Sequence, residues 1–400
     1  MKYLIKIHLL LLFILATSNL SYAKQNEVRY FSKIAGVISP MLEFKPRGEI
    51  TKSQAKDMRH YRVTYDNKGR TESIKFFHRQ WPSNGAYFYA HEVRYLYKEN
   101  QKIRTYFNTK GEPMGMWRHY YRGGEIHREV YDTVDGVITL SIFDTKGKQI
   151  EVGTGTYHFK SKPISDNAFI QWQFKKDGTP NTIFNYLPFE VSMITKNEHG
   201  FLYQIIALDS KSDSANNLKR IVHPKAGFSE MRLNFDVNGN ENGWDFRDLE
   251  GNLVNRPEEG SDPGYATWKF QFDWKDEKLG LFKGYDEFYF DKNNKRVCKN
   301  NGVCKTRYDV DEYGNFTNLS TYDKNGKLFV NPDSKYAKFN YLYNEYGRRV
   351  KEEYLDATGK LRKEGVAVVS IEYEDWQGVA KVSEFDYQMK PIVNEESKSD

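Results

Sequence analysis

One five-residue pattern constrains this chain more than any other feature: an aromatic residue, then Asp or Asn, two variable residues, and Gly. It occurs six times in 400 residues, whereas composition alone predicts roughly half a match in a chain of this length. The six copies are Tyr65–Gly69, Phe107–Gly111, Phe143–Gly147, Phe235–Gly239, Tyr322–Gly326 and Tyr343–Gly347, and degenerate copies follow at Leu355–Gly359 and Phe385–Met389.

The residue types in this pattern predict a tight turn between two strands. The aromatic residue ends a strand, the Asp or Asn side chain bonds its own backbone, and Gly adopts the positive φ that closes the turn. A second spacing accompanies the pattern, since glycines recur 12 residues apart, as at Gly124 and Gly136, Gly239 and Gly251, Gly314 and Gly326, and Gly347 and Gly359. Turn signals at this interval, joined by alternating stretches, are typical of successive antiparallel hairpins.

The predicted fold class is therefore all-β, either an elongated antiparallel sheet or a hairpin-repeat solenoid, with an irregular middle segment. Aromatic residues make up 16% of the chain and hydrophobic residues only 39%. This composition is typical of strands that have one face exposed to solvent. In the C-terminal part the hairpins group into longer units, each with a small-residue strand at Tyr265-Ala266, Tyr336-Ala337 or Val366-Ala367. Alanine at that point predicts close approach of a neighbouring strand.

The sequence divides into five predicted regions. They are a signal peptide (1–23), an N-terminal hairpin-repeat region (24–160), an irregular β segment or insertion (161–230), a C-terminal hairpin-repeat region (231–393) and a disordered tail (394–400). Turn signals and aromatic strands still occur in the middle region, but they depart from the repeat, and residues 209–220 are predicted to form an exposed polar loop.

The first residues have the layout of a secretory signal. Lys2 and Lys6 precede an apolar stretch from Leu9 to Ala16, and Ser21 and Ala23 supply small residues for a signal peptidase. The alternative is a membrane anchor, but crossing a bilayer takes about 20 apolar residues, and no later segment is apolar for that long. We expect a soluble protein in the periplasm or outside the cell, without a transmembrane segment after cleavage.

The charge of the chain argues against a nucleic-acid partner. Removing residues 1–23 deletes two lysines and no acids, which lowers the formal net charge from +6 to +4. The remaining charges are interspersed along the chain, whereas nucleic-acid-binding proteins concentrate lysine and arginine on one face or in one tail.

The repeats carry a family resemblance. The tandem Tyr-Asp-x-x-Gly units resemble the YD-type hairpin repeats of bacterial surface and secreted proteins. The stretch 115–125, Gly-Met-Trp-Arg-His-Tyr-Tyr-Arg-Gly-Gly-Glu, is similar to MORN-type repeats. Both resemblances imply stacked hairpins and no particular activity. The long shell and toxin core of toxin-associated YD proteins are absent, so that role is not carried over.

The two cysteines, Cys298 and Cys304, are predicted to form a disulfide. Asn301-Gly302 between them favours a tight turn that brings the flanking residues together, and an exported protein meets oxidising conditions. The alternatives are a redox-active pair or half of a metal site, but the five-residue spacer is not the two-residue spacing of either.

The sequence carries no complete motif for catalysis, for a cofactor or for a metal. The sequence has no Gly-x-Ser-x-Gly elbow, phosphate-binding loop or nucleotide fingerprint. Residues from Asp309 to Gly314 begin like a calcium-binding EF-hand loop, but Ser320 stands where the bidentate Glu is needed. We therefore predict a protein that is not an enzyme and binds no metal or cofactor; a hydrolase with an unidentified carboxylate site remains an alternative.

The predicted function is that of an exported scaffold that binds a protein or a cell-envelope component through a sheet face or edge. The alternative within binding is recognition of a glycan or the cell wall by exposed aromatic rings. Trp117, Tyr120 and Tyr121 are the candidate sugar-stacking residues, with Trp244 and Trp268 behind them. These rings could instead cover the sheet and form its core.

Overall fold

The computed structural model describes residues 27–35, 38–84, 90–115, 126–184, 187–260, 262–374 and 379–392. Its first strands are β1 (Glu27–Ile34), β2 (Pro46–Ile50), β3 (Arg59–Tyr65), β4 (Thr71–His78), β5 (Trp81–Pro82), β6 (Glu92–Tyr97), β7 (Gln101–Phe107), β8 (Arg128–Val134), β9 (Val137–Phe143), β10 (His158–Ser165), β11 (Ala168–Phe174) and β12 (Val191–Lys196). The remaining strands are β13 (Leu202–Ala207), β14 (Glu230–Phe235), β15 (Glu241–Arg247), β16 (Thr267–Asp276), β17 (Leu281–Phe290), β18 (Arg296–Val297), β19 (Lys305–Val310), β20 (Phe316–Tyr322), β21 (Lys338–Tyr343), β22 (Arg349–Leu355), β23 (Val368–Tyr373) and β24 (Val379–Phe385).

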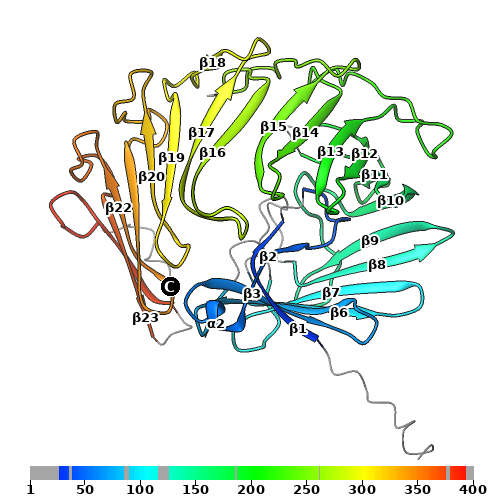
Figure 1. Cartoon of the computed structure of the whole chain (residues 1–400), viewed down its shortest axis with the longest axis horizontal. Helices are drawn as coiled ribbons and strands as arrows, with labels where there is room; N and C mark the ends of the chain where they lie inside the picture. Colours follow the sequence, from blue (N-terminus) through cyan, green and yellow to red (C-terminus); the bar gives the residue numbers. More distant parts are fainter. Residues whose placement is uncertain are drawn as a thin grey trace, which may run out of the picture.

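These 24 strands form one open antiparallel sheet, which confirms the all-β prediction. From β6 onward each long strand pairs with its neighbours in sequence, while β1 lies between β2 and β3, and the short β5 and β18 pair beside β4 and β17. The sheet curves as it proceeds, so its hairpins fan round β1 and β2 (Figure 1). In the described residues the helical structure is the single turn α2 (Lys52–Ala55), which a capping box between Thr51 and Gln54 begins.

The repeated pattern forms the turn that its residues predict. The first copy is representative: β3 ends at Tyr65, and Asp66 Oδ1 accepts hydrogen bonds from the backbone N–H groups of Lys68 and Arg70, both at 2.9 Å. Gly69 then adopts a φ of 74°, which glycine reaches without steric cost. The same pair of side-chain bonds recurs at Asn108, Asp144, Asp236, Asp323, Asn344, Asp356 and Asp386.

The alanines of the longer units lie where neighbouring strands approach closely. Ala266, Ala337 and Ala367 are fully buried. The N–H of Ala337 donates to the carbonyl of Leu355 at 2.8 Å, and its own carbonyl accepts from Thr321 at 2.9 Å. A residue with a larger side chain would push these strands apart.

The middle region, 161–230, contributes paired strands to the same sheet. β10 pairs with β9, and β13 pairs with β14, so the ladder is continuous across both ends of the region. Its irregular part is the long connection between β13 and β14, where Leu218 packs on a small apolar cluster of Ile170, Val191, Ile206 and Leu208. The division of the chain into separate regions stays a prediction.

The main core lies on the inner face of the curved sheet, from β3 to β15. Cross-strand pairs such as Val63–Ile74, Ile194–Ile205 and Met231–Phe246 place alternate residues of successive strands on this one face. The fully buried side chains on it include Val63, Ile74, Val93, Tyr106, Leu140, Ile194, Ile205, Met231 and Phe246.

Residues 38–44, between β1 and β2, cover part of this inner face. Ile38, Leu42 and Phe44 join the main core. The backbone carbonyl of Pro40 accepts hydrogen bonds from Arg104 Nη2 at 2.7 Å and from the Tyr131 hydroxyl at 2.8 Å. The N-terminal part of the chain therefore seals the first half of the inner face.

Four successive hairpin turns of the C-terminal half contact the N-terminal strands. The contacts are Arg47 Nη1 to the Gly239 carbonyl (2.6 Å), Ser32 Oγ to the Leu279 carbonyl (2.6 Å), the Arg59 N–H to the Tyr313 carbonyl (3.1 Å), and the ring of Trp81 on the ring of Tyr346 (4.8 Å between centroids). The inner ends of these hairpins thus converge on β1 to β5.

Candidate aromatic face and pocket

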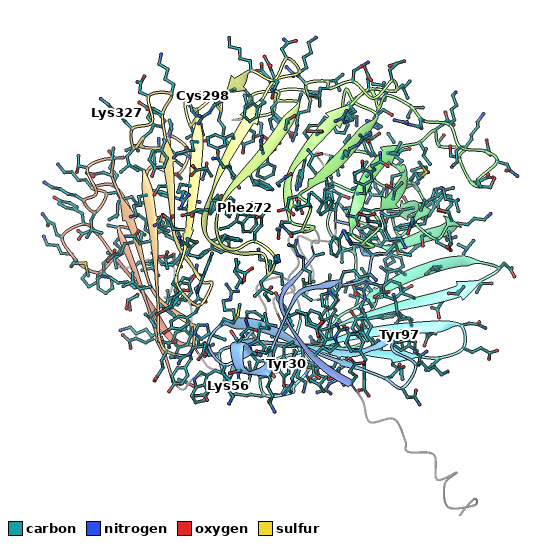
Figure 2. All side chains as sticks on the ribbon, viewed as in Figure 1. Tyr30, Lys56, Tyr97, Phe272, Cys298 and Lys327 are labelled. Carbon is teal, nitrogen blue, oxygen red and sulfur yellow. A yellow bond between two sulfur atoms is a disulfide. The ribbon has the colours of Figure 1, made fainter. Side chains whose placement is uncertain are left out.

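The inner face continues past β15, but there it is lined by aromatic rings that are only half-buried. On β16 the aromatic residues Trp268, Phe270, Phe272 and Trp274 alternate with exposed polar residues. Because side chains on a strand alternate between faces, all four rings lie on one side. Phe272 points toward the middle of the molecule, whereas Lys327 and Cys298 lie at its periphery (Figure 2).

Neighbouring strands extend this aromatic surface. Phe272 is paired with Tyr285 on β17, which is paired with Tyr308 on β19. The Tyr285 and Tyr308 rings stack with centroids 4.8 Å apart, and Phe272 stacks on Trp274 at 4.5 Å. Phe316 borders Tyr308 at 6.0 Å and is 37% exposed. We call Phe270, Phe272, Trp274, Phe282, Tyr285, Tyr308 and Phe316 the aromatic face.

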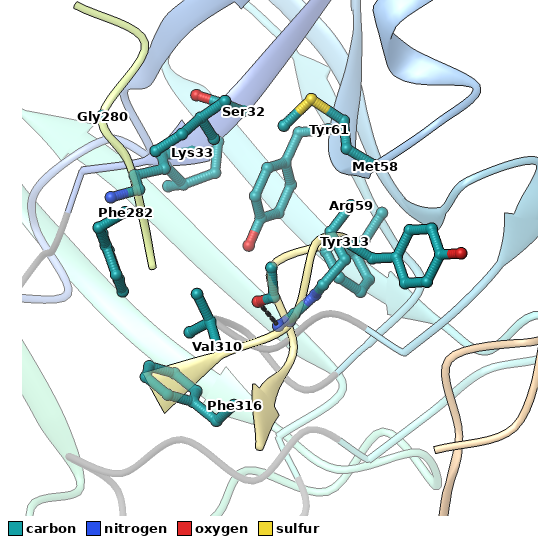
Figure 3. A pocket seen from close by; sticks show the side chains of 14 residues that line it. Ser32, Lys33, Met58, Arg59, Tyr61, Gly280, Phe282, Val310, Tyr313 and Phe316 are labelled. Carbon is teal, nitrogen blue, oxygen red and sulfur yellow. Dashed lines mark hydrogen bonds between the residues drawn. The ribbon is translucent and has the colours of Figure 1, made fainter. Parts of the chain in front are cut away.

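A pocket of about 330 Å³ opens at the inner end of the aromatic face. Lys33 of β1, Arg59 and Tyr61 of β3, Phe282 of β17 and Phe316 of β20 are among its 14 lining residues (Figure 3). The ring of Tyr61 points into the space between these elements, with Val310 and Phe316 opposite. The convergence of the hairpin turns on β1 and β3 brings the two sides of the pocket together.

Charged side chains in the lining are cationic. The lining contains Lys33 and Arg59 and no Asp or Glu. Arg59 is already engaged, since its Nη1 donates to the Gly314 carbonyl at 2.9 Å and its guanidinium lies 5.1 Å from the centre of the Phe76 ring. This pocket therefore offers no pair of carboxylates for hydrolysis.

Lys33 differs from Arg59 in having no hydrogen-bond partner among the described residues. Among the described residues, no hydrogen bond or ion pair reaches its Nζ, which lies 4.3 Å from the centre of the Phe282 ring and 6.0 Å from that of Trp274. Burial and, to a smaller extent, the charge of nearby Arg47 lower the pKa of Lys33 to about 7, against an opposing effect of Asp236. The ammonium is thus held in an apolar site that disfavours its charge.

Glu287 is a buried carboxyl on the same inner face. It lies between Phe270 and Thr306 in the strand register and is 7% exposed. Burial raises its pKa to about 7, only partly opposed by the charge of Lys299. Burial also raises the pKa of the neighbouring hydroxyls of Tyr285, Tyr289 and Tyr308, so these groups stay neutral at physiological pH.

The residues singled out from sequence meet different outcomes. The predicted disulfide between Cys298 and Cys304 is present. Trp117, Tyr120 and Tyr121 lie outside the described residues, so their stacking role stays a prediction. Trp244 and Trp268 pair edge to face at 4.9 Å and pack against the main core. Among the described residues, no cluster of three His, Cys, Asp or Glu side chains is arranged to hold a metal.

Sequence reasoning missed the aromatic face and its pocket. The alternation of four aromatics with polar residues along β16 is a signal that could have marked one wall. Nothing local in the sequence links that wall to Lys33, because the two are joined only through the turn contacts.

In the described residues, no helix is long and apolar enough to span a membrane.

Comparisons with known proteins leave the family open. No family model matches the chain, and no curated protein matches it either. Among solved structures, the chain is similar to a mutant of the Photorhabdus luminescens Tc holotoxin pore, with 9% identity and a TM-score of 0.18, over 83% of this chain and 19% of that chain. This chain thus matches less than a fifth of the toxin chain.

A second similar structure is that of a Bacteroides fragilis protein assigned as a 6-phosphogluconolactonase. The identity is 10% and the TM-score 0.15, over 91% of this chain and 95% of that chain. Both TM-scores are too low to carry an argument about fold or function. The likeness to YD-type repeats therefore stays a resemblance of sequence motifs.

Proposed function

We propose that this protein is an exported, non-enzymatic scaffold that holds a protein or another envelope component against its aromatic face. The observation that supports this proposal is the change in burial along one continuous face. Inner-face residues of β3 to β15 are sealed by residues 38–44 and by loops, whereas Phe272, Tyr285 and Tyr308 further along are half-buried. A continuous apolar surface that is only partly covered is typical of interaction sites.

A photo-crosslinking pair on β16 tests the proposal. We expect Phe272→p-benzoylphenylalanine to crosslink to one defined protein in envelope extracts of the producing cells. Gln271 is the matched control, because it is adjacent on the strand and exposed on the opposite face. Equal labelling from positions 271 and 272, or none from either, would contradict binding at the aromatic face.

Glycan recognition is the second candidate, favoured by the partly open ring of Phe316. Aromatic rings stack on sugars when one face is free, but Phe272 already stacks on Trp274 and Tyr285 on Tyr308. A glycan-binding protein should sediment with insoluble peptidoglycan and lose that binding on Phe316→Ala or on Trp117→Ala. A protein-binding scaffold should ignore polysaccharide.

Export is tested separately. If residues 1–23 are a cleaved signal peptide, intact-mass and N-terminal analysis of the protein from its native host should find a mature chain that begins at Lys24. A cytoplasmic chain that retains Met1 would contradict export without affecting the binding experiment.

A further inference from the structure

We propose that the pocket at the inner end of the aromatic face binds a small amphipathic carboxylate, with its apolar body among Phe282, Val310 and Phe316 and its carboxylate on Lys33. This site goes beyond the scaffold function, because it concerns a small molecule rather than a partner protein. It is also formed largely by residues of β1, β3 and the hairpin turns.

The size and lining of the pocket favour an apolar body. Its volume of about 330 Å³ falls at the small end of the roughly 300–1,000 Å³ typical of small-molecule sites. Ile34, Met58, Phe76, Leu281 and Val310 supply aliphatic and aromatic lining. A sugar would leave most of its hydroxyls without partners against such walls, which costs affinity.

The charge of the pocket favours an anionic head group. The two ionisable cations in the lining face no lining carboxylate, and Arg59 is already bound to the Gly314 carbonyl. Lys33 is left with the faces of Phe282 and Trp274. A carboxylate that reached Nζ would form a charge-assisted hydrogen bond in a partly desolvated site, where such bonds are strong.

The experiment compares three probes that share one ten-carbon chain. Binding of decanoate, decanol and decyltrimethylammonium to the full mature chain is measured by isothermal titration calorimetry. We expect decanoate to bind more tightly than decanol, and the cationic probe not to bind, since it would face Lys33. Equal affinities for decanoate and decanol would overturn the role of Lys33.

Variants of Lys33 distinguish the contribution of its charge to decanoate binding from that of the apolar lining. Lys33→Met keeps an apolar chain of similar length, and we expect it to weaken decanoate binding by about tenfold or more while decanol binding is unchanged. Lys33→Arg should retain part of the decanoate affinity. Lys45→Met is the matched control, because Lys45 is exposed and does not line the pocket. Unchanged decanoate binding in Lys33→Met would refute the proposal.

A pocket-filling variant locates the apolar body. Val310→Phe adds bulk to the lining, and we expect it to reduce binding of decanoate and decanol together. Thermal melting of each variant checks that it is folded. Decanoate binding that survives Val310→Phe would place the probe elsewhere on the protein. Success or failure here is independent of crosslinking at Phe272, which reports on a macromolecular partner.

Discussion

Glu287 shows how one buried carboxyl makes stability depend on pH. Its folded-state pKa of about 7 exceeds the ordinary Glu value, so the folded protein holds a proton that the unfolded chain has already released near neutrality. Stability is therefore undiminished below the unfolded pKa and falls as the pH rises toward 7. We expect Glu287→Gln to raise the free energy of unfolding above pH 7 by roughly 2 kcal/mol, with the difference vanishing near pH 4 in urea titrations.

Glu353 provides a control with the opposite sign. A hydrogen bond from Lys351 lowers its pKa, with a smaller contribution from Asn340. Its stabilising effect is therefore present above the unfolded pKa and is lost as the pH falls. Glu353→Gln should leave unchanged the fall in the free energy of unfolding that Glu287 causes between pH 4 and 7. If Glu287→Gln and Glu353→Gln gave the same pH profile, the buried state of Glu287 would be refuted.

Gly347 combines a positive φ with a close contact. Its φ is 71°, and a Cβ at this position would overlap the ring of the buried His78. Gly326 has a similar φ of 75° with open space around it. We expect Gly326→Ala to cost about 1 kcal/mol from backbone strain and Gly347→Ala about 1–3 kcal/mol more from steric overlap. Chemical denaturation measures both losses, and equal losses would contradict the contact between the β21–β22 turn and β4.

At the level of elements, the segment 38–44 is held by a buried ion pair. Arg104 Nε lies 3.0 Å from Glu129 Oε2, both side chains are 0% exposed, and Arg104 also donates to the Pro40 carbonyl. Removing one charge leaves the other buried without the opposite charge of its partner. Arg104→Met and Glu129→Leu should each cost about 3–5 kcal/mol, and the double variant should cost less than their sum. Additive losses in denaturant unfolding would show that the two side chains do not act as a pair.

The hairpin turns could be predicted from sequence because their chemistry is local. Asp66 and Gly69 suffice to specify one turn, and the same logic found the other copies of the pattern. Two turns of the same kind have another residue where the pattern has Gly: Asn294 adopts a φ of 60° and Met389 a φ of 61°. Asn tolerates that conformation, so the turn after Asp291 forms without the glycine that the pattern requires.

For the whole molecule, the two halves of the inner face should differ in local stability. Inner-face side chains from β3 to β15 are mostly buried, whereas those of β19 to β22 are mostly half-buried. Opening β21 and β22 exposes less apolar area, so it costs less free energy. Native-state hydrogen exchange followed by mass spectrometry should therefore find faster exchange in peptides from β21 and β22 than in those from β6 and β7. Uniform protection would contradict the difference in packing.

The curvature of the sheet, and with it the pocket, could not be predicted from sequence. Periodicity identifies which residues share a face, but not how far the sheet bends before its turns meet other strands. Lys33 and Phe282 come together only because the β16–β17 turn reaches β1, and Arg59 meets Gly314 for the same reason at the next hairpin. Such contacts depend on twist summed over many strands, which no short motif specifies.

The bond from Ser32 to the Leu279 carbonyl spans 247 residues of chain, and this has a kinetic consequence. Hairpins can form one by one as local units. The turns at their inner ends, however, cannot contact β1 and β3 until these distant parts of the chain have come together. Closing such long loops is entropically costly and slows folding. The N-terminal strands therefore gain these contacts only after the β16–β17 and β19–β20 hairpins have formed and met them, and the pocket between them can exist only from that stage.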